Sequence, residues 1–109
     1  MYTPSRHFAD FHIAGFTYWD GIEVLEDLKV GNKLDLRSEA ENPYDPEAVA
    51  IFYENRKLGY IPKASNAQIS QILYFGNNIF EAFICQIDLE KHPERQVRVV
   101  VKLIDAARA

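Results

Sequence analysis

Short segments of apolar, aromatic and β-branched residues recur along the chain, and turn-forming residues separate them. Residues 96–104 alternate, with valines on one face and Arg98 and Lys102 on the other, which is the period of a β-strand. Residues 48–53 are continuously apolar, as in a strand that is buried on both faces. The pattern predicts strands at 8–16, 33–37, 48–53, 58–61, 79–89 and 96–104, with a hairpin turn at 55–57.

One segment has the spacing of an α-helix. Ser65 and Gln68 form a capping-box pattern, apolar residues follow at helical spacing, and Gly76 can end the helix in a left-handed conformation. Residues 23–28 fit either a short helix or a structured loop. About six strands with one or two short helices predict a mainly β fold, a small β-barrel.

The length and the cysteine content limit the class of protein. A chain of 109 residues has room for one core, and we expect a single domain over 1–109 with its core at about 8–104. The single cysteine, Cys85, excludes an internal disulfide, and its apolar neighbours predict an inert core thiol. No apolar run approaches the roughly 20 residues of a membrane span, and the N-terminus lacks a signal-peptide pattern. We therefore expect a cytoplasmic protein without a membrane partner.

Charge is distributed unevenly along the chain. Residues 1–55 contain four Lys or Arg and eleven Asp or Glu, whereas residues 56–109 contain eight and five, and the net charge is −4. This balance excludes a broad basic stripe but is compatible with a small anion site. Any contact with nucleic acid should therefore be compact and neutralise few phosphates.

The segment 42–46, Asn-Pro-Tyr-Asp-Pro, is the first candidate binding site. Pro43 restricts Asn42 to extended conformations, and Asn and Asp side chains can bond to nearby backbone N–H groups. Tyr44 can stack on a base, and Asp45 can accept a hydrogen bond from a sugar hydroxyl. The alternative is a tight loop in which Tyr44 covers an edge of the barrel.

Residues 15–21 and 58–63 contain the other candidates. Because Tyr18 and Trp19 are adjacent, an extended chain would turn at least one of them to solvent, although a core residue beside an edge residue would give the same pattern. Lys63 follows a strand and precedes the predicted helix, where an ammonium group can meet a phosphate. The alternative for Lys63 is a solvated side chain at a strand end.

The sequence contains no pattern typical of catalysis or metal binding. His7, His12 and His92 lack ligand spacing, and there is no phosphate-binding loop or nucleophile motif. We therefore expect no enzyme activity, no cofactor and no bound metal.

Taken together, the three segments resemble the HIRAN domain family. The likeness covers about residues 8–104 and consists of Gly-x-x-Tyr-aromatic-x-Gly at 15–21, the Asn-Pro-Tyr-Asp block within 41–51, and Leu-Gly-Tyr-Ile-Pro-Lys at 58–63. HIRAN domains are similar to OB-folds, so the resemblance implies a small OB-like β-barrel. The helicase motor and zinc fingers of the larger proteins that contain such domains are not part of the likeness.

The resemblance also implies a function and a set of site residues. In fork-remodelling helicase-like proteins, the HIRAN domain captures the 3′ end of single-stranded DNA. By this likeness, Asp45 accepts a hydrogen bond from the terminal 3′-hydroxyl, Tyr18 and Tyr44 pack against terminal bases, and Lys63 contacts a phosphate. Tyr60 stands where the family has a histidine near the phosphates, and Thr17 where it has an arginine.

The leading hypothesis is a non-catalytic module that binds a single-stranded DNA end in DNA repair or replication-fork processing. The absence of the two basic residues and the negative net charge support an alternative, a protein-interaction or structural module with the same fold and little DNA affinity. The candidate nucleic-acid-binding residues are Tyr18, Trp19, Tyr44, Asp45, Tyr60 and Lys63, with Arg56 and Lys57 as outer candidates.

Overall fold

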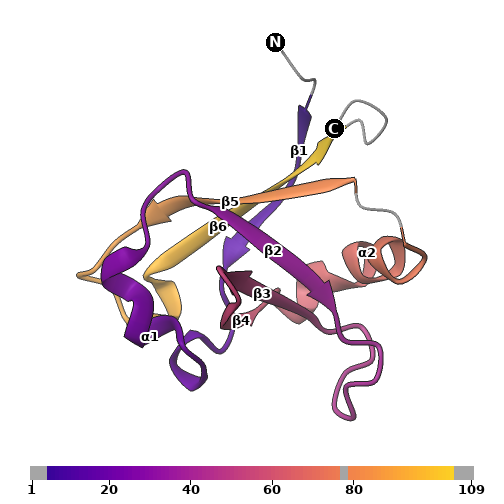
Figure 1. The fold of residues 1–109 in the computed structure, drawn as a ribbon, viewed down its shortest axis with the longest axis horizontal. Helices are drawn as coiled ribbons and strands as arrows, with labels where there is room; N and C mark the ends of the chain where they lie inside the picture. The colour runs from indigo at the N-terminus through magenta and orange to yellow at the C-terminus, as the bar shows by residue number, and fades with distance from the viewer. Residues whose placement is uncertain (1–4, 77–78, 105–109) are drawn as a thin grey trace.

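The computed structural model describes residues 5–76 and 79–104, and within them the chain forms one six-stranded antiparallel sheet and two α-helices (Figure 1). The sheet has the order β1-β6-β5-β2-β3-β4, so the predicted mainly β fold is confirmed. The strands are β1 (Ser5–His12), β2 (Lys33–Ser38), β3 (Val49–Tyr53), β4 (Arg56–Tyr60), β5 (Phe80–Ile87) and β6 (Val97–Ile104). The helices are α1 (Gly21–Val24) and α2 (Lys63–Tyr74), and short 3₁₀ turns form η1 (Phe16–Tyr18), η2 (Leu25–Asp27) and η3 (Pro93–Arg95).

Strand β2 joins the two halves of the curled sheet, β1-β6-β5 and β3-β4, and each half pairs with a different part of β2. Lys33 and Leu34 pair with β5, whereas residues 35–38 pair with β3. The two edges of the curled sheet meet at one isolated bridge between Ala14 and Tyr60, through N–H···O bonds of 2.8 and 2.9 Å. A single bridge does not close the sheet into a barrel, but the barrel-like shape is consistent with an OB fold.

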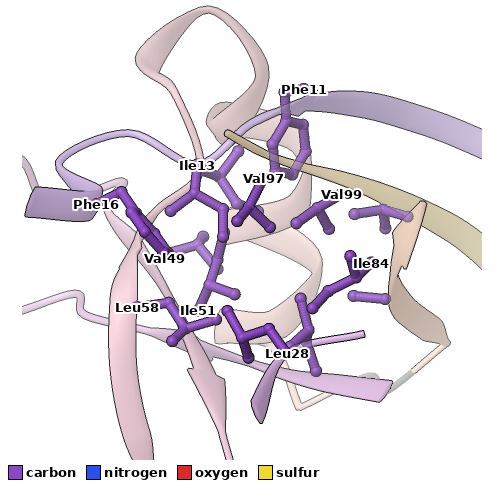
Figure 2. Packing of buried hydrophobic residues seen from close by; sticks show 14 of the residues in the cluster. Phe11, Ile13, Phe16, Leu28, Val49, Ile51, Leu58, Ile84, Val97 and Val99 are labelled. Atoms are coloured by element: carbon purple, nitrogen blue, oxygen red, sulfur yellow. The ribbon is translucent and has the colours of Figure 1, made fainter. Parts of the chain in front are cut away.

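Apolar side chains from all six strands fill the inside of the curled sheet (Figure 2). The valines of β6 at 97, 99 and 101 are at most 2% exposed, which confirms the inward face predicted from their alternation. Phe16 from η1, Val24 from α1 and Ile69 from α2 complete the core.

The first strand is shorter at its C-terminal end than predicted. It ends at His12 rather than Phe16, because Gly15 takes a left-handed conformation (φ 69°) and the chain turns into η1. Phe16 enters the core, and Tyr18 and Trp19 are both exposed. The hairpin turn between β3 and β4 lies at 54–55 rather than 55–57, with positive φ at both residues, as a type I′ turn requires.

The N-cap of helix α2 lies three residues before Ser65, which the capping-box pattern predicts as the cap. Pro62 is its N-cap, and no side-chain cap bond forms; the Ser65 N–H donates instead to the Pro62 carbonyl at 2.9 Å. Pro62 ends the preceding extended segment with ψ 146° and brings no N–H that would need a partner. At the other end Gly76 has φ 82°, as predicted. Residues 23–28, for which two structures were open, contribute to α1 and η2.

The prediction that Cys85 is a core thiol is wrong. Its neighbour Ile84 points inward and is 1% exposed, so strand alternation turns Cys85 to the opposite face, where it is exposed. The register of β5 against β6 also shifts between Ile84 and Gln86. An apolar run therefore does not bury both faces of β5.

Candidate nucleic-acid interface

A pocket of about 340 Å³, here called the aromatic pocket, lies where the loop between β2 and β3 meets the N-terminal end of α2. Figure 1 shows this loop and α2 on the same side of the fold. Five of the six candidate residues line the pocket, namely Trp19, Tyr44, Asp45, Tyr60 and Lys63, and Ala14, Asn42, Ala48, Ile61 and Asn66 complete it. Tyr18 does not line it; its side chain is 82% exposed beside Trp19.

Asn42 shapes the loop that presents Tyr44 and Asp45. Its Oδ1 accepts hydrogen bonds from the backbone N–H of Tyr44 (2.8 Å) and of Asp45 (3.1 Å), which is the turn chemistry expected of asparagine before proline. Tyr44 is 91% exposed at the tip, so its ring is accessible to a ligand. The loop therefore holds an aromatic ring and a carboxylate side by side.

The Asp45 carboxylate is held from two directions. Its Oδ1 accepts from the backbone N–H of Glu47 at 2.9 Å, and its Oδ2 accepts from Asn66 Nδ2 at 3.0 Å. A carboxylate offers about four lone-pair positions, so each oxygen keeps a further acceptor position. The arrangement can accept hydroxyl donors while its orientation stays fixed.

Glu39, at the C-terminal end of β2, connects the segments that form the pocket walls. Its carboxylate accepts hydrogen bonds from Lys57 Nζ (2.9 Å), from the Tyr60 hydroxyl (2.8 Å) and from Asn42 Nδ2 (3.1 Å). One partly buried side chain thus joins the loop, through Asn42, to β4, through Lys57 and Tyr60.

Lys57 lies against the aromatic rings rather than in the solvent. Its ammonium group is 3.8 Å from the centre of the Trp19 ring and 4.3 Å from that of Tyr60, and the two rings pack edge to face at 5.9 Å. Arg56, the other outer candidate, pairs with Asp20 and Glu23. Both outer candidates are therefore engaged within the protein, and Lys63 is the lysine that lines the pocket.

The pair of Glu39 and Lys57 depends on pH. Burial disfavours the charged form of each group, but the hydrogen bonds to Glu39 from Lys57, Asn42 and Tyr60 and those of Lys57 to Tyr60 and Glu39 outweigh it. The pKa of Glu39 lies below its ordinary value of 4.5, and the pKa of Lys57 lies above its ordinary 10.5. The stabilisation from Glu39 is lost as pH falls through its folded pKa, and that from Lys57 as pH rises through its own, so the pair contributes fully at neutral pH.

Glu39→Gln is expected to lower the free energy of unfolding at pH 7 by about 1–3 kcal/mol, because Lys57 keeps its charge but loses its counter-ion. Urea denaturation measures the difference from wild type, which should shrink as the pH falls from 4.5 through the lower pKa of the folded Glu39. Asp20→Asn is the control, since the ion pair of Asp20 with Arg56 is about 45% exposed on both sides and contributes little. A difference that stays constant from pH 7 to pH 3 would contradict the assignment.

Sequence reasoning did not find Asn66 or Glu39. Asn66 is 4% exposed and lies three residues after Lys63, so both occupy neighbouring positions on one face of α2. A predicted helix start at Lys63 would have placed Lys63 and Asn66 on the same face of the helix. Glu39 reaches Asn42, Lys57 and Tyr60 only through the pairing of β2, β3 and β4, for which the local sequence carries no signal.

The HIRAN domain family model matches residues 7–104, which is most of the chain. The chain belongs to the HIRAN domain family. This membership confirms the resemblance seen in the three sequence segments. Homology to HIRAN domains implies a nucleic-acid-binding module.

Two crystal structures resemble this HIRAN domain in fold. A protein from Lactobacillus plantarum is 21% identical, with a TM-score of 0.78 and coverage of 95% of this chain and 99% of that chain. The HIRAN domain of human HLTF is 16% identical, with a TM-score of 0.62 and coverage of 92% and 77%. The curated proteins contain no significant sequence match.

Two further properties concern the residues 5–76 and 79–104. None of the helices in these ranges has the length and apolarity that a membrane crossing requires. The same ranges contain no cluster of three or more His, Cys, Asp or Glu side chains suited to a metal ion.

Proposed function

We propose that this HIRAN domain, a single domain with its core at about 8–104, binds the 3′ end of single-stranded DNA and serves DNA repair or replication-fork processing. The observation that supports this proposal is the content of the aromatic pocket. Three aromatic rings, a carboxylate and an ammonium group, from separate segments of the chain, line one hollow. These are the groups that stack bases, accept a sugar hydroxyl and meet a phosphate.

Each of the six candidate residues receives a role in this proposal. Tyr44 and Trp19 stack on the terminal bases, Asp45 accepts the hydrogen bond of the 3′-hydroxyl, and Lys63 contacts a phosphate. Tyr60 forms the wall behind Trp19, and Tyr18, outside the pocket, offers a further ring to the preceding nucleotide. A volume of about 340 Å³ is at the lower end of the range for ligand pockets, which suits one terminal nucleotide.

A fluorescence titration tests the proposal, because Trp19 is the single tryptophan of the chain and lines the pocket. A short single strand with a free 3′-hydroxyl should change the Trp19 emission saturably, and the same strand with a 3′-phosphate should bind more weakly, since a dianion would face Asp45. With one lysine lining the pocket, log Kd should change with log salt with a slope of about 1 in magnitude. Equal affinity for both ends, or no change at micromolar protein in low salt, would refute the proposal.

A second surface favours the alternative of a protein-interaction module. Tyr74 and Phe75, at the C-terminal end of α2, are 64% and 75% exposed and pack edge to face at 5.2 Å. Exposed aromatic residues are enriched at protein interfaces. If the titration shows no DNA binding, this surface becomes the leading candidate for function.

A further inference from the structure

Asn66 is a polar side chain buried on the inner side of α2. Among the described residues, Asn66 and Ser70 are the buried polar side chains, each 4% exposed, and they lie one helical turn apart. A buried amide without partners would cost stability, so its position requires a specific contact. Asn66 lines the aromatic pocket, and its contact there is with Asp45.

The contact between Asn66 and Asp45 crosses from the helix to the loop. Asn66 Nδ2 donates to Asp45 Oδ2 at 3.0 Å, while the Glu47 backbone N–H donates to Oδ1 at 2.9 Å. Both donors are neutral. They fix the orientation of the carboxylate without supplying the counter-charge that a lysine or arginine would bring. The negative charge therefore remains available to a ligand that donates a hydrogen bond.

We infer that Asn66 is a positioning residue, which aims the remaining acceptor positions of Asp45 into the aromatic pocket and so determines the preference for a sugar hydroxyl. The inference rests on the proposed function of the pocket. It assigns hydroxyl recognition to a pair, with Asp45 as the acceptor and Asn66 as the group that orients it.

Asn66→Asp is the test variant, because it keeps the shape of the side chain but replaces the donor by a charged acceptor. The Kd of each protein is measured through Trp19 emission with two short single strands, one ending in a 3′-hydroxyl and one in a 3′-deoxy sugar. The wild type should prefer the hydroxyl end. At pH 7 the variant should lose about tenfold or more of that preference, since a hydrogen bond to a charged group is removed.

Lowering the pH provides a rescue that a structural role would not produce. Two carboxyl groups at hydrogen-bond distance share a proton, so the introduced group becomes a donor again as the pH falls from 7 to 5. The preference of the variant should then recover, and that of the wild type should not rise in the same way. Lys63 is the other charged residue that lines the pocket with Asp45, and the three histidines do not line it.

Ser70→Ala is the matched control, because Ser70 is equally buried on the same helix but does not line the aromatic pocket. It should leave the preference for the hydroxyl end unchanged. The inference is overturned if Asn66→Asp keeps the wild-type preference at pH 7, or if the variant loses the preference and does not regain it at pH 5.

A ligand-free measurement separates failure of this inference from failure of the proposed function. If the wild type binds neither strand, the proposed function fails. The contact itself is then judged by NMR of the Asn66 side-chain amide, whose proton signals should shift in Asp45→Ala and not in Ser70→Ala. Unshifted signals in Asp45→Ala would overturn the positioning role directly.

Discussion

Asp45→Ala is expected to abolish the preference for a free 3′-hydroxyl over a blocked or 3′-deoxy end. The variant removes the acceptor that the pocket presents to the sugar, and a hydrogen bond to a charged group contributes about 1.5–3 kcal/mol. Affinities for the three ends, measured through Trp19 emission, should become equal within error. A preference that survives in Asp45→Ala would show that another group recognises the hydroxyl.

Tyr44→Ala is the companion variant, because Tyr44 lies next to Asp45 in the loop but contributes a ring rather than an acceptor. Loss of one stacking contact should weaken binding to every end by about 1–3 kcal/mol and leave the preference among ends intact. The two variants together distinguish stacking from hydroxyl recognition. If Tyr44→Ala changed the preference instead, the loop itself would have been disturbed.

Asp45→Asn is not a conservative change in this pocket. Both carboxylate oxygens already accept hydrogen bonds, one from the Glu47 N–H and one from Asn66. An amide has one oxygen, so its NH₂ group would face either the Glu47 N–H or the Asn66 side chain, and Asn66 would then have to turn its own oxygen toward it. A loss of preference in this variant therefore reports both the missing charge and the rearranged hydrogen bonds.

Gly59→Ala is expected to lower the free energy of unfolding by at least about 2 kcal/mol. Gly59 in β4 has φ 151°, and an added Cβ would collide with the Ala14 carbonyl oxygen and lie 2.7 Å from Ile13 Cγ2. These atoms belong to the segment that meets β4 at the bridge between Ala14 and Tyr60. Urea denaturation measures the effect, and the thermal midpoint should fall by about 8 °C or more.

Gly76→Ala separates steric collision from backbone strain in this prediction. Gly76 also has a positive φ, 82°, but within the described part of the chain no atom beyond its sequence neighbours lies within 4 Å of an added Cβ. It should destabilise the protein less than Gly59→Ala does. Equal losses in the two variants would assign the whole effect to the backbone conformation and none to the edge contact.

The fold was predictable where its cause is local. The alternation of β6 depends on neighbouring residues alone, and its inward valines are buried as predicted. The start of α2 was misplaced because Ser65 and Gln68 satisfy a capping pattern that Pro62 makes unnecessary. Cys85 was misplaced because the apolar composition of β5 conceals its alternation.

The pocket residues that belong to short sequence motifs were predictable. The loop at 42–46 and Lys63 are recognisable from sequence, and the structure brings both to the same hollow. The bond from Lys57 to Glu39 spans 18 residues and exists only because β2, β3 and β4 pair in one register. Asn66 was assigned to the capping box at 65–68, so its contact with Asp45 was not predicted.

The bridge between Ala14 and Tyr60 has a consequence for the dynamics of the pocket. Both residues line the pocket, and the bridge consists of two backbone hydrogen bonds at the meeting of two sheet edges. Short edge contacts open locally at far lower free energy than central strands do. Opening of this seam would separate two pocket walls without unfolding the core. A ligand that contacts both walls would therefore hold the two sheet edges together and stabilise the curled sheet as a whole.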